Sequence, residues 1–335
     1  MPKLLSALLV AAIAAAATPA SAQDGKQLQF LSFPQGSLVY GAAAALGAVV
    51  AGKTDYTIVP VPYAGPQVFV PMLDRGEGAF AVINVGDSKQ AYNGEKPAYE
   101  RAHRNLRLVA IGHENTLAPL VTVRSGITSA AGLKGKAVSG VYSAHQSCLD
   151  LANAVIANYG MAWADFNVFP VPSVVPGIKA LGEGRSVATL CAAPEMAVVK
   201  ETNAKTPIRF ISIDPSPAAM QRARQAFPGL EPRKIKAGAS EGFVEDVDTM
   251  VYHFYLLTHA NLPDNAVYAV VKTIWNSLPE LRQTNPVYRS WAQERMTGRG
   301  VTVPYHPGAI RFYKEMGVWS AEKDADTRAL LPKTQ

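Results

Sequence analysis

The chain has 335 residues and a formal net charge of +6 at pH 7. Its Lys and Arg residues are scattered rather than gathered into blocks, which excludes the basic patch of a nucleic-acid-binding module. This charge balance indicates a solvated surface with a mild preference for anionic solutes. The histidines form no HExxH pair and the two cysteines form no CxxC pair, so we expect neither a metal site nor a cofactor.

The first 22 residues have the pattern of a secretory signal peptide. Lys3 precedes an apolar run from Leu4 to Ala17, and the small residues Ala20-Ser-Ala22 follow it. The run of about 14 residues is shorter than the roughly 20 that cross a bilayer. We therefore predict cleavage after Ala22, a periplasmic location and a mature chain of 313 residues.

Short apolar runs alternate with segments of helical period along most of the chain. This alternation predicts parallel sheets covered by helices on both faces. A chain of this length exceeds one compact core, so we expect two α/β lobes. The expected strands are 28–33, 56–62, 79–85, 106–112, 120–124, 137–142, 166–171, 187–192 and 208–213, and the expected helices include 37–51 and 146–159.

The pattern changes near Asp246, where a long β-rich run over 248–258 leads to helices beginning near Pro263, Asn285 and Pro307. Because these late helices have no strands of their own to cover, we expect them to pack on the first lobe. The predicted division of the chain is a signal peptide over 1–22, a discontinuous first lobe over 23–125 and 246–335, and a second lobe over 126–245.

Two polar turns that join a strand to a helix are candidate ligand contacts. The first runs from Phe33 to Tyr40 with Ser37 as the expected helix cap, and the second runs from Ser139 to Ser147. A helix start leaves N–H groups unpaired and carries partial positive charge, so it can hold a carboxylate. A serine at such a position is more often only a cap. In open α/β sheets ligands bind beyond the carboxyl ends of the strands, where both turns fall.

The two cysteines, Cys148 and Cys191, allow two interpretations. They can form a disulfide if the chain resides in an oxidising compartment. Each can instead be a small buried hydrophobic residue, since Cys191 lies in the apolar run 187–193. The sequence leaves both alternatives open.

The segment Gly238-Ala-Ser-Glu-Gly242 matches the GxSxG pattern of a nucleophile elbow. An elbow needs a buried strand before the serine and a helix after it, whereas a β-rich run follows here. We interpret the segment as a turn, expect no enzyme activity, and keep a periplasmic serine hydrolase that uses Ser240 as a remote alternative.

Several segments are similar to those of the TAXI family, the extracytoplasmic solute receptors of TRAP transporters. The most specific of them, Pro304-Tyr-His-Pro-Gly-Ala-Ile-Arg-Phe-Tyr-Lys-Glu-Met-Gly317, resembles the carboxy-terminal signature of that family. Supporting segments are Gly36–Tyr40, Leu73–Glu77 with Phe80–Asn84, Ser125–Lys136 and Leu262–Tyr268. The resemblance implies a type II periplasmic binding protein fold, in which two doubly wound lobes close by a hinge on a ligand cleft. It makes the segment from His306 onward a structural helix start.

The resemblance also implies a ligand and a partner. The ligand would be a small carboxylate or amino acid of the glutamate-like class, and the partner an integral-membrane TRAP permease. A binding protein or sensor that serves an ABC permease or a sensor kinase would share the same fold and pocket. The first loop, Ser32-Phe-Pro-Gln35, is bulkier and less polar than is usual in the family, which indicates a retuned pocket.

Ten residues are predicted to bind the ligand by carry-over from the family: Ser37, Tyr40, Tyr63, Gly65, Asn84, Asp87, Ser143, His145, Gln146 and Ser147. We expect the helix starts at Ser37 and Ser147 to bind a carboxylate, and Tyr40 and Tyr63 to provide stacking or lid contacts. His145 is either a ligand contact or a solvated loop residue. Asp87 would repel an anion, so it either binds a ligand amine or caps the following helix, and a cap is the commoner role.

Overall fold

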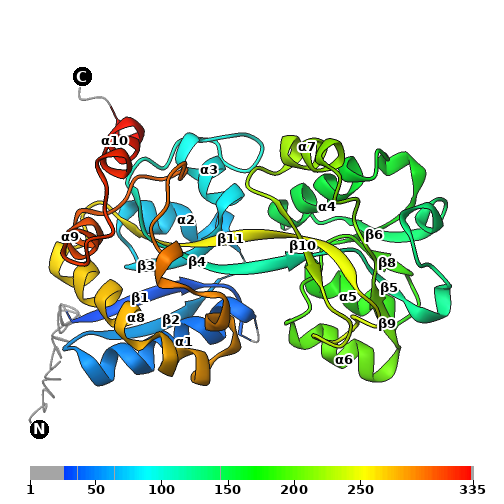
Figure 1. Cartoon of the computed structure of the whole chain (residues 1–335), viewed down its shortest axis with the longest axis horizontal. Coiled ribbons are helices and arrows are strands. Elements are labelled where there is room, and N and C mark those ends of the chain that lie inside the picture. Colours follow the sequence, from blue (N-terminus) through cyan, green and yellow to red (C-terminus); the bar gives the residue numbers. More distant parts are fainter. Residues whose placement is uncertain (1–25, 36, 64, 144, 333–335) are drawn as a thin grey trace, which may run out of the picture.

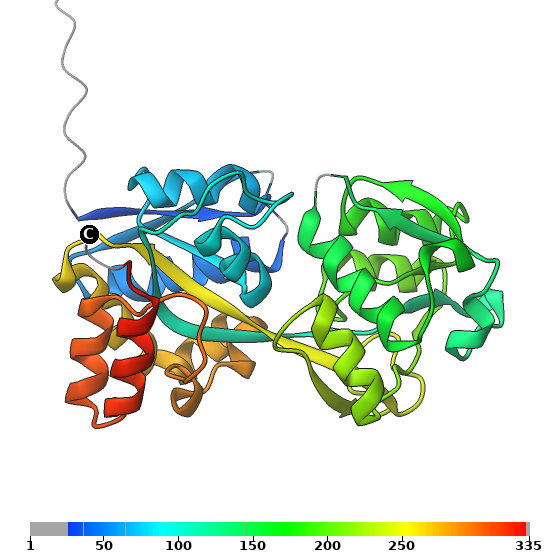
Figure 2. The ribbon, with the colours of Figure 1, turned by 90° about the horizontal axis from the view of Figure 1, so that it is seen from above.

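The computed structural model describes residues 26–35, 37–63, 65–143 and 145–332, so the predicted signal peptide lies outside the described residues. The chain forms two α/β lobes that lie side by side (Figure 1). Strands β4 (Leu106–Leu117) and β11 (Val247–His259) pair with each other and run from one lobe into the other (Figures 1 and 2). These two strands are the covalent connections between the lobes.

The first lobe is built on a six-stranded mixed sheet with the order β10-β11-β3-β1-β2, in which β4 also pairs with β11. Its other strands are β1 (Gln27–Ser32), β2 (Thr57–Pro62) and β3 (Phe80–Asn84). The sixth strand, β10 (Glu231–Ile235), pairs with the start of β11 and lies on the side of the second lobe (Figure 1). The β1 strand is parallel to β2 and β3, as predicted, but β11 is antiparallel to β3, β4 and β10. The expectation of purely parallel sheets is wrong here because β4 leaves the lobe and β11 returns beside it.

The second lobe is built on a five-stranded sheet with the order β7-β6-β8-β5-β9. Its strands are β5 (Leu120–Thr122), β6 (Ala137–Val141), β7 (Asn167–Val171), β8 (Ala188–Thr189) and β9 (Ile208–Phe210). The β6 strand is parallel to β7 and β8, whereas β5 is antiparallel to β8 and β9. The lobe boundaries given above stay a prediction, and the pairing of β5 favours a first crossing between β4 and β5, ahead of Ser125.

Helices flank both sheets. The first lobe carries α1 (Leu38–Lys53), α2 (Pro66–Arg75), α3 (Val85–Asn93), α8 (Asp264–Thr284), α9 (Pro307–Glu315) and α10 (Ala321–Leu330). The second lobe carries α4 (Gln146–Asn158), α5 (Val174–Gly182), α6 (Ala197–Lys205) and α7 (Pro217–Ala226). Short 3-10 helices span Val123–Ser125, Ala130–Leu133, Trp163–Asp165, Pro286–Ser290 and Gln293–Arg295. The helix expected near Asn285 is thus a short 3-10 helix, which Asn285 caps by accepting from the Val287 N–H.

The late helices pack on the first lobe, as predicted. The buried Tyr288 hydroxyl donates to the Ala42 carbonyl of α1 at 2.8 Å, and the buried Tyr313 hydroxyl donates to the Val109 carbonyl of β4 at 2.8 Å. His306 is fully buried as the N-cap of α9 and accepts from the Gly308 N–H through Nδ1 at 3.1 Å. The segment that begins at His306 is therefore a structural helix start, with Pro307 in its first turn.

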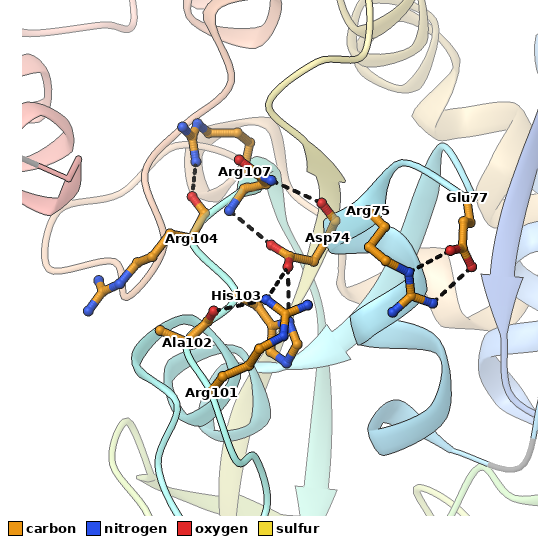
Figure 3. A network of polar contacts seen from close by, with 9 residues as sticks. Asp74, Arg75, Glu77, Arg101, Ala102, His103, Arg104 and Arg107 are labelled. Atoms are coloured by element: carbon orange, nitrogen blue, oxygen red, sulfur yellow. Dashed lines mark hydrogen bonds and ion pairs between the residues drawn. The ribbon is translucent and has the colours of Figure 1, made fainter. Parts of the chain in front are cut away.

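The Leu73–Glu77 segment contains a buried carboxylate, Asp74, that lies in a network of hydrogen bonds (Figure 3). Asp74, at the end of α2, accepts hydrogen bonds from Arg101 Nη1 at 3.0 Å, His103 Nδ1 at 3.1 Å and the Asn105 N–H at 3.0 Å. Burial alone would raise the pKa of Asp74, but these hydrogen bonds bring it below its ordinary value. The network holds the loop that follows α3 against α2, so its role is structural.

Candidate ligand-binding site

A cavity of about 510 Å³ lies between the two lobes. The first lobe contributes residues 33–35, residues 37–39 and Asn84, and the second lobe contributes residues at and near the starts of α4, α5 and α6. The crossing strands contribute Asn115, Leu117, Tyr252 and Phe254. A volume of this size is typical of a small-molecule site. Because both lobes and both crossing strands border the cavity, a movement of one lobe relative to the other changes its walls.

Five helices begin at the cavity. Their N-cap residues all border it: Ser37 of α1, Asn84 of α3, His145 of α4, Ser173 of α5 and Met196 of α6. Each helix start carries partial positive charge and unpaired backbone N–H groups. The cavity is therefore surrounded by the ends of helices that favour an anion.

The helix starts of the two lobes differ in how their N–H groups are used. In the first lobe, Ser37 Oγ accepts from the Tyr40 N–H at 3.2 Å and Asn84 Oδ1 accepts from the Asp87 N–H at 2.8 Å. In the second lobe, the N-cap side chains of α4, α5 and α6 make no such bond with the described residues. The Cys148 N–H of α4 and the Val199 N–H of α6 donate instead to the carbonyls of their own N-cap residues at 3.0 Å, and Pro176 of α5 has no N–H. In both lobes the first two N–H groups of each helix are the ones that can bind a ligand.

Charged side chains are few at the cavity. Lys179 of α5 is the single Lys or Arg among its described lining residues, and Glu201 of α6 is the single carboxylate. His145 is half-buried, and burial lowers its pKa to about 4. Its imidazole is therefore neutral at pH 7, and Lys179 supplies the positive charge.

Four of the predicted site residues border the cavity, namely Ser37, Asn84, His145 and Ser147. His145 is thus a half-buried wall residue, with its ring centroid 6.3 Å from that of Phe33 in the other lobe, and not the solvated loop residue of the alternative. The other six, Tyr40, Tyr63, Gly65, Asp87, Ser143 and Gln146, do not border the cavity as the described residues outline it.

The residues away from the cavity have local contacts that explain their positions. The Tyr40 hydroxyl accepts from Gln35 at 3.3 Å, and the Tyr63 ring packs 6.5 Å from Phe69. Gly65 is the buried N-cap of α2, and Ser143 is exposed. Strand periodicity and family carry-over could not distinguish these local roles from ligand contact.

Asp87 lies behind the cavity wall in the first turn of α3. Its Oδ2 accepts from Asn84 Nδ2 at 2.8 Å, while its N–H donates to Asn84 Oδ1, so the two side chains pair at the helix start. Burial raises the pKa of Asp87 to about 7, opposed by the neighbouring Ser147 hydroxyl of the second lobe and by Asn84. The residue that caps α3 is Asn84, whose side chain accepts from the Asp87 N–H, and the Asp87 carboxyl pairs with the Asn84 side-chain amide.

The lobes also touch beside the cavity. Asp150 of α4 accepts from Gln90 Nε2 of α3 through Oδ2 at 2.9 Å and from Gln146 Nε2 through Oδ1 at 2.9 Å. Gln146 was predicted to bind the ligand, but in the structure it donates a hydrogen bond to Asp150, which also accepts from Gln90 of the other lobe.

Cys148 and Cys191 form a disulfide with their Cα atoms 5.6 Å apart. The bridge joins the first turn of α4 to the segment after β8, and Cys191 itself borders the cavity. Of the two alternatives from the sequence, the structure contains the bridge, and it fixes two walls of the cavity relative to each other.

The GxSxG segment is a turn between β10 and β11, so the element that comes next after Ser240 is a strand and not a helix. It therefore lacks the strand–helix geometry of a nucleophile elbow. The residues described by the structure contain no cluster of His, Cys, Asp or Glu that could hold a metal ion. Their helices include none with the length and apolarity to span a membrane.

Several residues that border the cavity were not predicted from the sequence, above all Ser173, Lys179, Met196 and Glu201 of the second lobe. Ser173 follows β7 and precedes α5, which is the same strand, polar turn and helix pattern that singled out Ser37. The same sequence pattern could therefore have identified Ser173 as a candidate ligand contact. Lys179 and Glu201 sit inside helices, and no local pattern distinguishes them from solvated surface charges.

The chain matches the model of the NMT1-like family over residues 31–317. It belongs to the NMT1-like family. Among solved structures, it is similar to a periplasmic transporter (13% identity, 92% of this chain and 97% of the other, TM-score 0.53). It is also similar to PhnD1 from Prochlorococcus marinus, solved in complex with methylphosphonate (8% identity, 88% and 100%, TM-score 0.53). A TctC solute binding protein from Polaromonas shares 14% identity over 77% of this chain and 86% of its own, with a TM-score of 0.48.

At these identities the structural likeness concerns the fold alone. The two-lobed periplasmic binding protein fold predicted from the sequence is confirmed. The family match together with this fold supports the expectation of a solute-binding protein.

Proposed function

We propose that this NMT1-like protein is an extracytoplasmic receptor that binds a small organic acid or amino acid in the cavity between its lobes and delivers it to a TRAP-type membrane permease. The protein acts in the periplasm after removal of residues 1–22. The ligand contacts include Ser37, Asn84, His145 and Ser147 from the original prediction, together with Ser173 and Lys179.

One observation carries this proposal: five helix starts converge on a single cavity between two lobes. Partial positive charge at each start favours a negatively charged ligand group, and Lys179 adds a full positive charge. Ligand enclosed by both lobes stabilises the closed arrangement, which a membrane partner can distinguish from the open one.

The first test is a thermal unfolding screen of purified, ligand-stripped protein against carboxylates, amino acids, sulfonates, phosphonates and neutral sugars. A ligand present at 100 times its Kd adds about 2.7 kcal/mol of stability, which raises the melting midpoint. We expect a raised midpoint with carboxylates and none with sugars. If ligand-stripped protein responds to no compound, or only to sugars, the proposal fails.

The TRAP assignment rests on the Pro304–Gly317 segment and its resemblance to the TAXI signature. A binding protein or sensor for an ABC permease or a sensor kinase is the alternative, because it would share the fold and the cavity. Transport reconstituted in vesicles separates the two permease types: uptake driven by an ion gradient supports the proposal, and uptake that requires ATP contradicts it.

A further inference from the structure

We infer that the preferred ligand is a monocarboxylate with an apolar body, held by its carboxylate at the second lobe. This inference rests on the proposed function and narrows it. It differs from the glutamate-like ligand that the family resemblance suggests, because a glutamate-like ligand carries a second carboxylate.

The wall of the cavity is mostly apolar. The first lobe and the crossing strands contribute large apolar side chains, and the second lobe adds others of similar character: Phe33, Leu38, Leu117, Phe254, Val174 and Met196. Apolar surface in a ligand gains free energy when it leaves water for such a wall. A carboxylate in the same place would lose its hydration without gaining a partner.

The charges at the cavity provide for one carboxylate and not for two. Lys179 is the only cationic side chain among the described lining residues, since His145 is neutral at pH 7. A second carboxylate on the ligand would find no second cation there. It would also meet the carboxylate of Glu201, which borders the same cavity and repels negative charge.

The second lobe is the side that can hold the carboxylate. Lys179 belongs to α5 of that lobe, and α4, α5 and α6 begin at the cavity without capping side chains among the described residues. The first lobe contributes two helix starts, those of α1 and α3, and no Lys or Arg among the described lining residues. Three helix starts and the lysine therefore lie together on the second-lobe side of the cleft.

Matched ligands test the inference by isothermal titration calorimetry on ligand-stripped protein. Succinate and 4-methylpentanoate differ in that an isopropyl group replaces one carboxylate, and aspartate and leucine differ in the same way. We expect the member with the isopropyl group to bind about tenfold tighter or more in each pair that binds. 3-Phenylpropanoate extends the series to a larger apolar body.

Two variants with matched controls test the position of the carboxylate and the role of the wall. Lys179→Met should weaken monocarboxylate binding about tenfold or more, whereas Lys205→Met, at the exposed end of α6, should leave it unchanged. Met196→Lys places a second cation on the wall and should bring succinate within about threefold of 4-methylpentanoate. Met316→Lys makes the same change at an exposed methionine outside the cavity and should not alter the preference.

The outcomes separate the inference from the proposed function. If succinate, aspartate or glutamate binds as tightly as the branched compounds, or if Lys179→Met has no effect while the variant remains folded by circular dichroism, the inference is wrong and the receptor function stands. If no acid binds at all, the proposed function fails together with the inference.

Discussion

Asp87 predicts a specific dependence of stability on pH. Its carboxyl is 1% exposed, and burial raises its pKa from an ordinary value of 3.8 to about 7. Because the folded-state pKa is the higher one, the neutral carboxyl favours the folded state. This contribution is fully present below about pH 3.8 and is lost as the pH rises through 7. Asp87→Asn keeps an oxygen that can accept from Asn84 but removes the titration.

The magnitude follows from the two pKa values. One pKa unit corresponds to about 1.4 kcal/mol of free energy. Between pH 4.5 and pH 8, the free energy of unfolding of the wild type should therefore fall by about 3 kcal/mol through Asp87, and that of Asp87→Asn should not show this loss. The difference in unfolding free energy between the two proteins should therefore shift by this amount in favour of the variant. Urea denaturation followed by circular dichroism at both pH values measures it.

A control variant accounts for the loss of one negative charge. Asp55→Asn changes a carboxyl whose side chain is 83% exposed, and we expect its difference from wild type to vary little over the same pH range. If Asp87→Asn and wild type lose stability in parallel between pH 4.5 and 8, Asp87 is ionised in the folded protein throughout and the argument from burial is refuted.

Four other changes test the disulfide and the packing by urea denaturation. Replacing both Cys148 and Cys191 by Ala should cost about 4 kcal/mol, since the bridge spans a separation of 43 residues; equal stability would contradict a bridge in the purified protein. Gly308→Ala should cost about 1–3 kcal/mol, because the new Cβ would lie 2.3 Å from a backbone oxygen of α8. Gly52→Ala places its Cβ in open space in α1 and should stabilise the protein by about 0.5–1 kcal/mol. If Gly308→Ala proved the more stable of the two variants, the close packing at Gly308 would be refuted. Tyr313→Phe should cost about 1–2 kcal/mol through the lost hydrogen bond to β4, and no loss would mean that water replaces the hydroxyl.

Strands that are buried on both faces were predictable because their apolar runs are continuous. The prediction of 79–85 overlaps the observed β3, whose five residues are all buried. By contrast, β4 was expected to end at Gly112 but continues to Leu117. Its last part, Gly112-His-Glu-Asn-Thr-Leu117, is mostly polar, and its strand conformation depends on pairing with β11. No local pattern encodes a pairing between segments more than 100 residues apart.

The segment 187–192 illustrates the opposite error. Its apolar run predicted a full strand, yet β8 spans only Ala188–Thr189. The chain then leaves the sheet, and Cys191 bonds to Cys148 and borders the cavity. The side chains after Thr189 therefore line the cavity and form the disulfide instead of extending the strand. Hydrophobicity alone does not distinguish a cavity wall from a buried strand.

On this inference the two lobes bind different parts of the ligand. The second lobe presents three helix starts, those of α4, α5 and α6, together with Lys179, and these would bind the ligand carboxylate. The apolar body of that ligand then faces Phe33, Leu117 and Phe254, which border the cavity from the first lobe and the crossing strands. Covering that body requires closure of the first lobe, so on the proposed function the carboxylate determines where the ligand binds and the apolar body makes closure favourable.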